Sequence, residues 1–273
     1  MCSIRLLILP LCVLSASCFA GSQMRLFAGV DSTAISTKEV DEDGKQLNKE
    51  TGSLLGGGVG FEWLSASGVY YGGTIDVGDG DVDYIGESQL GVPIKNGTSY
   101  FYYWRPEVYA GKEIKEWWFE PRLEMEVGGQ LKERHIDPRT EGIDGYKESY
   151  TWWYSGVGVS FEFFGSEDWA WRSGLNYRMM IQPTNETTIA KRDIELGSTS
   201  SISWINSVYL NLGEELYLGI ELNITKIQMK RSRELYDGVR ETEDTTVPAW
   251  ISQPESNWQD INLRLAMSKR FDF

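Results

Sequence analysis

The C-terminal segment, residues 261–273, alternates apolar and polar side chains almost without interruption. One face would carry Ile261, Leu263, Leu265, Met267, Phe271 and Phe273, with Lys269 as its single polar member. The other would carry Asp260, Asn262, Arg264, Ala266, Ser268, Arg270 and Asp272. Because successive side chains of a strand point to opposite faces, this spacing predicts a strand between an apolar and a polar environment.

The same period of two recurs along the chain and predicts ten strands. They cover residues 24–35, 54–64, 69–77, 98–111, 117–131, 150–163, 169–181, 201–212, 216–228 and 258–273. Short turns are expected at 65–68, 113–116, 165–168 and 213–215, and long polar segments at 36–53, 78–97, 132–149, 182–200 and 229–257. Short turns on one side and long loops on the other are typical of a membrane-spanning barrel.

The polar faces distinguish this barrel from soluble all-β folds. A repeat near fifty residues is also compatible with a propeller, and a soluble sandwich alternates in the same way. In residues 117–131, however, one face carries four charged side chains: Glu120, Arg122, Glu124 and Glu126. A strand packed between propeller blades would bury these charges, whereas a wet lumen would solvate them.

No apolar run after residue 20 is long enough for a membrane helix, so a membrane crossing would have to use strands. A closed barrel satisfies every backbone polar group without water. The sequence therefore predicts an all-β fold, a ten-stranded antiparallel transmembrane β-barrel over residues 21–273. Pro106 and Pro121 fall inside predicted strands and predict bulges there.

The end of the chain resembles that of bacterial outer-membrane β-barrels. Their last strand commonly ends in Phe with an aromatic residue two positions earlier, as Phe271 and Phe273 do here, and the assembly machinery reads this signal. The resemblance implies an integral, multi-pass protein of a Gram-negative outer membrane, with the barrel-assembly machinery, membrane lipid and lipopolysaccharide as partners. It matches the class and no particular family.

Aromatic residues are placed as two interfacial girdles would require. One set lies beside the short turns and the C-terminus: Phe61, Trp63, Trp117, Phe119, Phe161, Phe163, Trp169, Trp171, Phe271 and Phe273. The other would lie at the opposite membrane surface: Tyr100, Tyr102, Trp104, Trp153, Tyr177 and Trp204. Lys269 faces lipid by parity, but it lies close enough to the surface for its amine to reach water.

Residues 1–20 have the layout of a secretory signal peptide, with Arg5 before an apolar run and small residues near Ala20. A lipoprotein leader with Cys18 as the modified residue is the alternative, although Ser15 stands where that motif usually has Leu. All three cysteines, Cys2, Cys12 and Cys18, lie in this leader. A chain beginning at residue 21 would have no disulfide or thiolate metal site.

Charge excludes one class of partner. The chain carries 40 acidic and 26 basic side chains, for a net charge of −14, so it would repel nucleic acid. No phosphate-binding loop, dinucleotide fingerprint, nucleophile elbow or zinc spacing is present, and we expect no cofactor.

Charged residues that parity directs inward form the main candidate site. They are Arg105, Glu107, Glu120, Arg122, Glu124, Glu126, Arg172, Arg178, Glu221 and Arg264. One interpretation is an ion-pair network that fills the bore, because opposite charges stabilise one another in a confined space. The other is a narrow, selective pore. Ten strands lie between the filled eight-stranded and the open sixteen-stranded barrels, which favours an occluded lumen.

Two weaker candidates lie in predicted loops. Asp79, Asp81 and Asp83 have the first spacing of a calcium loop, but Tyr84 and Leu90 occupy the usual glycine and bidentate glutamate positions. We therefore favour a solvated acidic loop over a calcium site.

The second weak candidate is His135 with Asp137, because histidine is the usual general base and the chain has only one. Together with Asp81 and Asp83 this pair is superficially similar to the Asp–His and Asp–Asp parts of omptin-family outer-membrane proteases. Here the His precedes the Asp and lies on the third predicted loop, where that family would have it on the fourth.

We expect a non-enzymatic barrel with a structural or surface-binding role through five external loops, which would contact lipopolysaccharide, an adhesion target or a protein partner. Basic runs at 191–192 and 230–233 would lie near lipopolysaccharide phosphates. A narrow pore for small solutes is the first alternative, and an omptin-like protease is the second.

Overall fold

The computed structural model describes residues 21–87, 93–114, 117, 119–139, 145–166, 168–188, 193–241 and 246–273. The predicted leader at 1–20 lies outside these residues. The strands are β1 (Gln23–Val40), β2 (Gln46–Leu64), β3 (Val69–Glu87), β4 (Pro93–Glu113), β5 (Arg122–Asp137), β6 (Tyr146–Gly165), β7 (Trp169–Thr187), β8 (Ile194–Glu195), β9 (Thr199–Gly213), β10 (Leu216–Met229), β11 (Leu235–Glu241), β12 (Thr246–Ile251) and β13 (Glu255–Asp272). The described residues contain no helix with the length and hydropathy of a membrane span.

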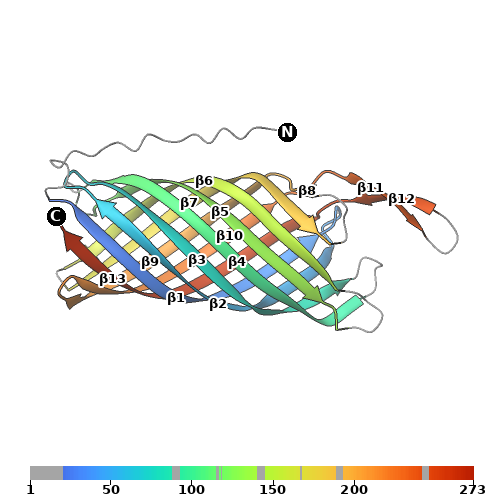
Figure 1. Ribbon diagram of the computed structural model, residues 1–273, viewed down its shortest axis with the longest axis horizontal. Helices are drawn as coiled ribbons and strands as arrows, with labels where there is room; N and C mark the ends of the chain where they lie inside the picture. Colours follow the sequence, from blue (N-terminus) through green and yellow to red (C-terminus); the bar gives the residue numbers. More distant parts are fainter. Residues whose placement is uncertain are drawn as a thin grey trace.

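The strands close into a barrel (Figure 1). Each long strand pairs antiparallel with its neighbours in the chain, and β1 pairs along its whole length with β13. Ten strands, β1–β7, β9, β10 and β13, make the wall, which confirms the predicted fold. The backbone N–H of Gly21 donates to the carbonyl of Phe273 over 2.7 Å, so the first and last described residues meet at one end.

The two ends of the barrel differ. The turn end carries the first and last described residues and the four short connections between β2–β3, β4–β5, β6–β7 and β9–β10. The loop end carries the other connections, including β8, which pairs with the end of β7, and β11 and β12, which pair with each other. This β11–β12 hairpin projects beyond the wall in Figure 1.

The strands are longer than a membrane requires. β4 has 21 residues and β2 has 19, whereas a transmembrane strand needs about 9–11. Most of the segments predicted as long loops are therefore strand. Between β1 and β2, for example, the expected loop at 36–53 shortens to residues 41–45. These segments had been interpreted as loops because their outward side chains are polar.

The two prolines do not produce the expected bulges. Pro121 precedes β5, which begins only at Arg122, so residues 117 and 119–121 belong to the turn and not to the predicted strand. Pro106 interrupts the pairing of β4 with β5, but the register is the same at Trp104–Leu131 and at Glu107–Gly128. The missing amide therefore costs local pairing without adding a residue to the strand.

Each strand keeps one face inward, yet the chemistry of both faces changes halfway along the barrel. On β5, Leu123, Met125 and Val127 are exposed on the outside of the turn-end half. Further along the same face lie Glu133, His135 and Asp137. The turn-end half is thus apolar outside and charged inside, whereas the loop-end half is polar outside.

The inside of the loop-end half is a hydrophobic core. Its buried apolar side chains are Ile35, Leu54, Val82, Tyr84, Ile94, Phe101, Tyr103, Ile136, Tyr150, Trp152, Tyr154, Leu196, Ile227, Met229 and Trp258. Such a core is stabilised by water exclusion, as in a soluble protein. Hydrocarbon therefore has to surround only the turn-end half.

Aromatic contacts gather at the turn end. Trp63 stacks on Phe273 with ring centroids 5.2 Å apart, and Phe119 contacts Phe161 at 5.6 Å. Lys269 donates from its amine to the backbone carbonyl of Glu214 in the β9–β10 turn, so its charge leaves the lipid-facing wall.

Two adjacent tryptophans on β6 provide a test of this division. Trp152 is 1% exposed in the loop-end core, and Trp153 is 60% exposed on the outer wall. We expect Trp152→Ala to lower the free energy of unfolding in detergent micelles by about 3–5 kcal/mol, because it leaves a cavity. Trp153→Ala, the matched control, should cost clearly less. Equal losses in guanidinium titrations would contradict a packed core at this level.

Candidate functional site

The centre of the lumen holds a cluster of two arginines and two aspartates. Arg105 on β4 lies 3.1 Å from Asp76 on β3. Arg264 on β13 bridges Asp76 and Asp31, with an N–O distance of 3.2 Å to Asp31. Tyr103 donates its hydroxyl to Asp31 over 3.3 Å. The cluster links strands on both sides of the β1–β13 seam.

Further ion pairs surround this centre. Arg178 contacts Glu107 at 2.8 Å and Glu126 at 2.6 Å. Nearer the turn end, Arg122 bridges Glu62 at 3.2 Å and Glu113 at 2.6 Å, and Arg172 pairs with Glu162 at 2.9 Å. Glu113 and Glu162 were not among the predicted lumen residues. Glu113 lies in a segment predicted as a turn, and Glu162 lies at the end of the predicted strand 150–163.

Seven of the ten predicted lumen residues thus take part in ion pairs, namely Arg105, Glu107, Arg122, Glu126, Arg172, Arg178 and Arg264. Glu124 accepts a hydrogen bond from the Tyr70 hydroxyl at 3.3 Å, and Glu221 accepts one from Ser207 at 3.3 Å. Glu120 is placed differently from the prediction. It lies in the β4–β5 turn with a φ of 35°, because β5 starts two residues later.

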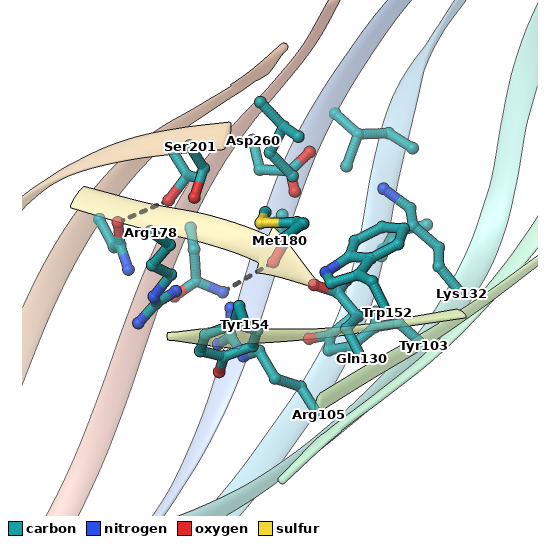
Figure 2. A pocket seen from close by; sticks show the side chains of 17 residues that line it. Tyr103, Arg105, Gln130, Lys132, Trp152, Tyr154, Arg178, Met180, Ser201 and Asp260 are labelled. Atoms are coloured by element: carbon teal, nitrogen blue, oxygen red, sulfur yellow. Dashed lines mark hydrogen bonds between the residues drawn. The ribbon is translucent and has the colours of Figure 1, made fainter. Parts of the chain in front are cut away.

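A cavity of about 230 Å³ remains among these charges in the turn-end half. Its wall includes Arg25, Glu62, Tyr109, Glu124 and Glu221. A smaller pocket of about 50 Å³ lies where the charged lumen meets the hydrophobic core. Figure 2 shows the side chains around it, which range from Arg105 and Arg178 to Trp152 and Met180.

Aromatic rings close the bore above this pocket. Trp258 packs against Tyr150 and Trp152, with ring centroids 5.1 and 6.2 Å apart. The amine of Lys132 lies 4.2 Å from the centre of the Trp258 ring and 5.2 Å from that of Phe101, a cation–π arrangement. We call these residues, with Ile227 and Met229, the aromatic plug.

The opposite wall of the bore fills the remaining space with a second apolar cluster, Ile35, Leu54, Val82, Phe101 and Tyr103. The Tyr103 ring depends on two glycines. A Cβ at Gly56 or Gly78 would lie 2.7 or 2.6 Å from its atoms, closer than side chains tolerate. The sequence therefore leaves room for the ring across the bore.

Beyond the plug, one guanidinium holds three carboxylates. Arg134 on β5 contacts Glu148 on β6 through Nε at 2.6 Å, Glu50 on β2 at 2.9 Å and Glu39 on β1 at 3.1 Å. All four side chains are buried. Gln253 reaches into the cluster from the β12–β13 connection and donates to Glu39 over 3.4 Å. This Arg134 cluster ties four parts of the barrel together at its loop end.

The sequence analysis missed the Arg134 cluster, although parity could have found it. Lys132 and Arg134 continue the inward face of Arg122, Glu124 and Glu126, but residues beyond 131 had been assigned to a loop. Burial raises the pKa of Glu39 above its ordinary value of 4.5. Glu148 and Glu50 act in the same direction, and Arg134 opposes them. With three carboxylates around one cation, Glu39 therefore tends to retain its proton.

The weaker candidates all lie on the outer wall. His135 and Asp137 point outward from β5 and not into the bore. Asp79, Asp81 and Asp83 point outward from β3, a strand and not the predicted loop. Register places Asp81 opposite Tyr100 and Tyr100 opposite His135, so Asp81 and His135 are two strand spacings apart, about 10 Å.

The aspartates on β3 do not converge on one point. Residues two apart on a strand are separated by about 6.5 Å, and the Tyr100 hydroxyl donates to Asp79 over 2.9 Å. Within the described part of the chain, no group of three or more His, Cys, Asp or Glu side chains is arranged to hold a metal ion.

Comparison with solved structures identifies the class. The outer-membrane protease OmpT of Escherichia coli superposes with a TM-score of 0.54 at 11% identity, over 92% of this chain and 97% of that one. The translocator domain of NalP from Neisseria meningitidis gives 0.46 at 11% identity over 91% and 88%. OprG of Pseudomonas aeruginosa gives 0.40 at 10% identity over 93% and 98%. The chain is an integral outer-membrane β-barrel.

No protein-family model matches the chain, and no curated protein matches it. At these identities, the likeness to solved outer-membrane barrels establishes the fold alone. In this class the short turns face the periplasm and the loops face the exterior, so the loop-end half would extend from the cell surface.

The Arg134 cluster makes stability depend on pH. We expect Arg134→Met to lose about 3–5 kcal/mol of unfolding free energy at pH 7, because three buried carboxylates would then lack their cation. The folded-state pKa of Glu39 is raised. Its contribution to stability is therefore complete below about pH 4.5 and is lost as the pH rises through the folded pKa. The loss of unfolding free energy caused by Arg134→Met should therefore become smaller towards acidic pH, because protonated carboxylates do not need the cation.

Arg231→Met is the matched control, because Arg231 lies at the surface beside the exposed Glu42. Its effect should stay within about 0.5 kcal/mol at every pH. Unfolding in detergent micelles between pH 4 and 8 measures both variants. A loss for Arg134→Met that does not change with pH would show that the three carboxylates are not its cause.

Proposed function

We propose that this protein is a non-enzymatic surface barrel, whose rigid loop-end half and β11–β12 hairpin contact partners outside the cell. The observation that carries the proposal is the aromatic plug. Trp152, Trp258 and Phe101 are each less than 2% exposed, and they fill the bore between the lumen cavity and the loop end. A bore packed to this degree supports a binding or structural role over solute passage.

The long strands give such a role a structural basis. They raise the loop-end half above the apolar band, and polar and charged side chains are frequent on its outer wall. A buried core and the Arg134 cluster hold this wall rigid, and a rigid surface loses little conformational entropy on binding. Phe271 and Phe273 remain our proposed signal for the assembly machinery, since both are exposed at the end of β13.

The positions of the titratable residues argue against hydrolysis. The side chains of His135, Asp137, Asp81 and Asp83 all lie on the open outer wall. An acid–base pair acts within hydrogen-bond reach, about 2.6–3.2 Å, whereas register separates Asp81 from His135 by about 10 Å. The protease activity in the name of OmpT therefore remains that protein's own.

Conductance separates this proposal from the narrow-pore alternative. We expect the folded protein to give no steady single-channel current in planar bilayers, because the plug blocks the bore. Trp152→Ser with Trp258→Ser, which thins the plug, should raise the frequency of openings if the double variant keeps its heat-modifiable gel mobility. Steady current through the unaltered protein would refute the proposal.

The β11–β12 hairpin provides the second test. Its strands pair only with each other among the described residues, so replacing residues 235–251 by a Gly–Ser linker should leave barrel folding unchanged. We expect bacteria that display this variant to adhere to cultured epithelial layers several-fold less than bacteria with the intact chain. Equal adhesion at equal surface expression would rule out the hairpin as the contact.

A further inference from the structure

Three lysines stand on one side of the outer wall, just above the apolar band. Lys38 on β1 and Lys49 on β2 are direct cross-strand neighbours. Lys226 on β10 points outward from the same side of the barrel, on which β10, β13, β1 and β2 are consecutive in the sheet. All three side chains are exposed. We call them the lysine face.

In the part of the chain that the structure describes, the lysines of the lysine face are not neutralised by an ion pair. Like charges directly opposite on neighbouring strands destabilise a sheet, so the Lys38–Lys49 pair is unfavourable by itself. Among the described residues, none of the three lysines makes an ion pair, even though the chain carries 40 acidic side chains. The nearest carboxylate along β13, Glu255, lies beside Lys230 at 4.0 Å. An external anion would remove this repulsion.

The wall is hollowed between these lysines. A groove of about 650 Å³ runs along β9, β10, β13 and β1, and Lys38 and Lys226 lie on it. Neutral side chains that donate hydrogen bonds line the remainder of its polar part: Ser36, Ser200, Gln228, Asn257 and Gln259. No acidic side chain lines it. Amide, hydroxyl and ammonium donors around one groove suit phosphate and sugar oxygens.

The height of the groove points to a lipid. Lys226 lies two residues above Ile224 on β10, and Gln259 lies two residues above the exposed Ile261 on β13. At its lower end, the groove is lined by Tyr177 and Ile202, which face outward. The lysine face thus begins where the hydrocarbon ends, at the level of lipid headgroups.

The basic residues that the sequence analysis had connected with lipopolysaccharide are less suitable. Arg231 lies 2.6 Å from Glu42, and Lys230 lies beside Glu255. The run at 191–192 falls outside the described residues. The basic groups near 230 therefore already have acidic neighbours, whereas those of the lysine face do not.

We propose that the lysine face and its groove bind the phosphorylated sugar headgroup of an outer-leaflet glycolipid. Lys38 and Lys226 are separated by two strand spacings, about 10 Å, across the sheet and by two residues, about 6.5 Å, along the strands, which suits a headgroup with more than one phosphate. The proposal depends on the membrane location and not on the non-enzymatic role. We favour a lipid over free phosphate because the groove opens directly above the apolar wall.

Binding to lipid A in mixed detergent micelles tests this site. The probes are bis-phosphorylated lipid A, the same lipid with both phosphates removed, and inorganic phosphate as competitor. We expect Lys38→Gln, Lys49→Gln and Lys226→Gln together to weaken binding of the phosphorylated lipid by roughly a hundredfold, at about fivefold for each lysine. The corresponding Arg variants should bind like the unaltered protein.

The matched control removes three other exposed lysines of the loop-end half, Lys45, Lys95 and Lys147, and should change binding less than threefold. A second readout is thermal unfolding. Without lipid A, Lys49→Gln should raise Tm because it relieves repulsion from Lys38, and added lipid A should stabilise this variant less than the unaltered protein.

Equal weakening by both triple variants would overturn the proposal. So would equal affinity for the dephosphorylated lipid, or displacement of lipid A by millimolar inorganic phosphate, which would indicate a free-phosphate site. Heat-modifiable mobility verifies that each variant is folded. Conductance and adhesion do not enter these measurements, so failure here is distinguishable from failure of the proposed function.

Discussion

Closure of the sheet by β1 and β13 is the constraint on which the rest of the structure depends. In hydrocarbon, each unpaired backbone N–H or C=O costs several kcal/mol, so an open edge there is not tolerated. Pairing from Gln23–Asp272 to Val40–Glu255 removes both edges at once. The closed wall then separates an inside from an outside, and every later feature follows from what fills each side.

Above the apolar band, the outer face of the same wall contacts water and no longer contacts hydrocarbon. Water surrounds the loop-end half, so burial of apolar side chains inside becomes favourable and the outer face becomes polar. The strands need no change of register for this, because alternation already gives each face its own set of residues. The charged lumen and the aromatic plug are thus two responses of one sheet to two surroundings.

Alternation in the sequence was sufficient to predict ten antiparallel strands. It directed Glu120 into the lumen, whereas this residue lies in the β4–β5 turn. Strand length was not predictable in the same way. Lys132, Arg134 and Ile136 continue the inward face of β5, but their outward neighbours Glu133, His135 and Asp137 are polar, as in a loop. The sequence pattern reveals a strand where one face is apolar and the other polar. It does not distinguish a polar loop from a strand whose outer face is polar and exposed to water. The Arg134 cluster joins residues from β1, β2, β5 and β6, and only the folded wall brings them together.

The position of Trp258 links the plug to biogenesis. This residue lies on β13, the final strand, and its ring packs against Tyr150 and Trp152 of β6. A partly folded barrel without β13 would lack both the β1–β13 seam and the Trp258 ring of the aromatic plug. The strand that closes the wall therefore also completes the packing inside the bore, so both depend on the same pairing of β13 with β1.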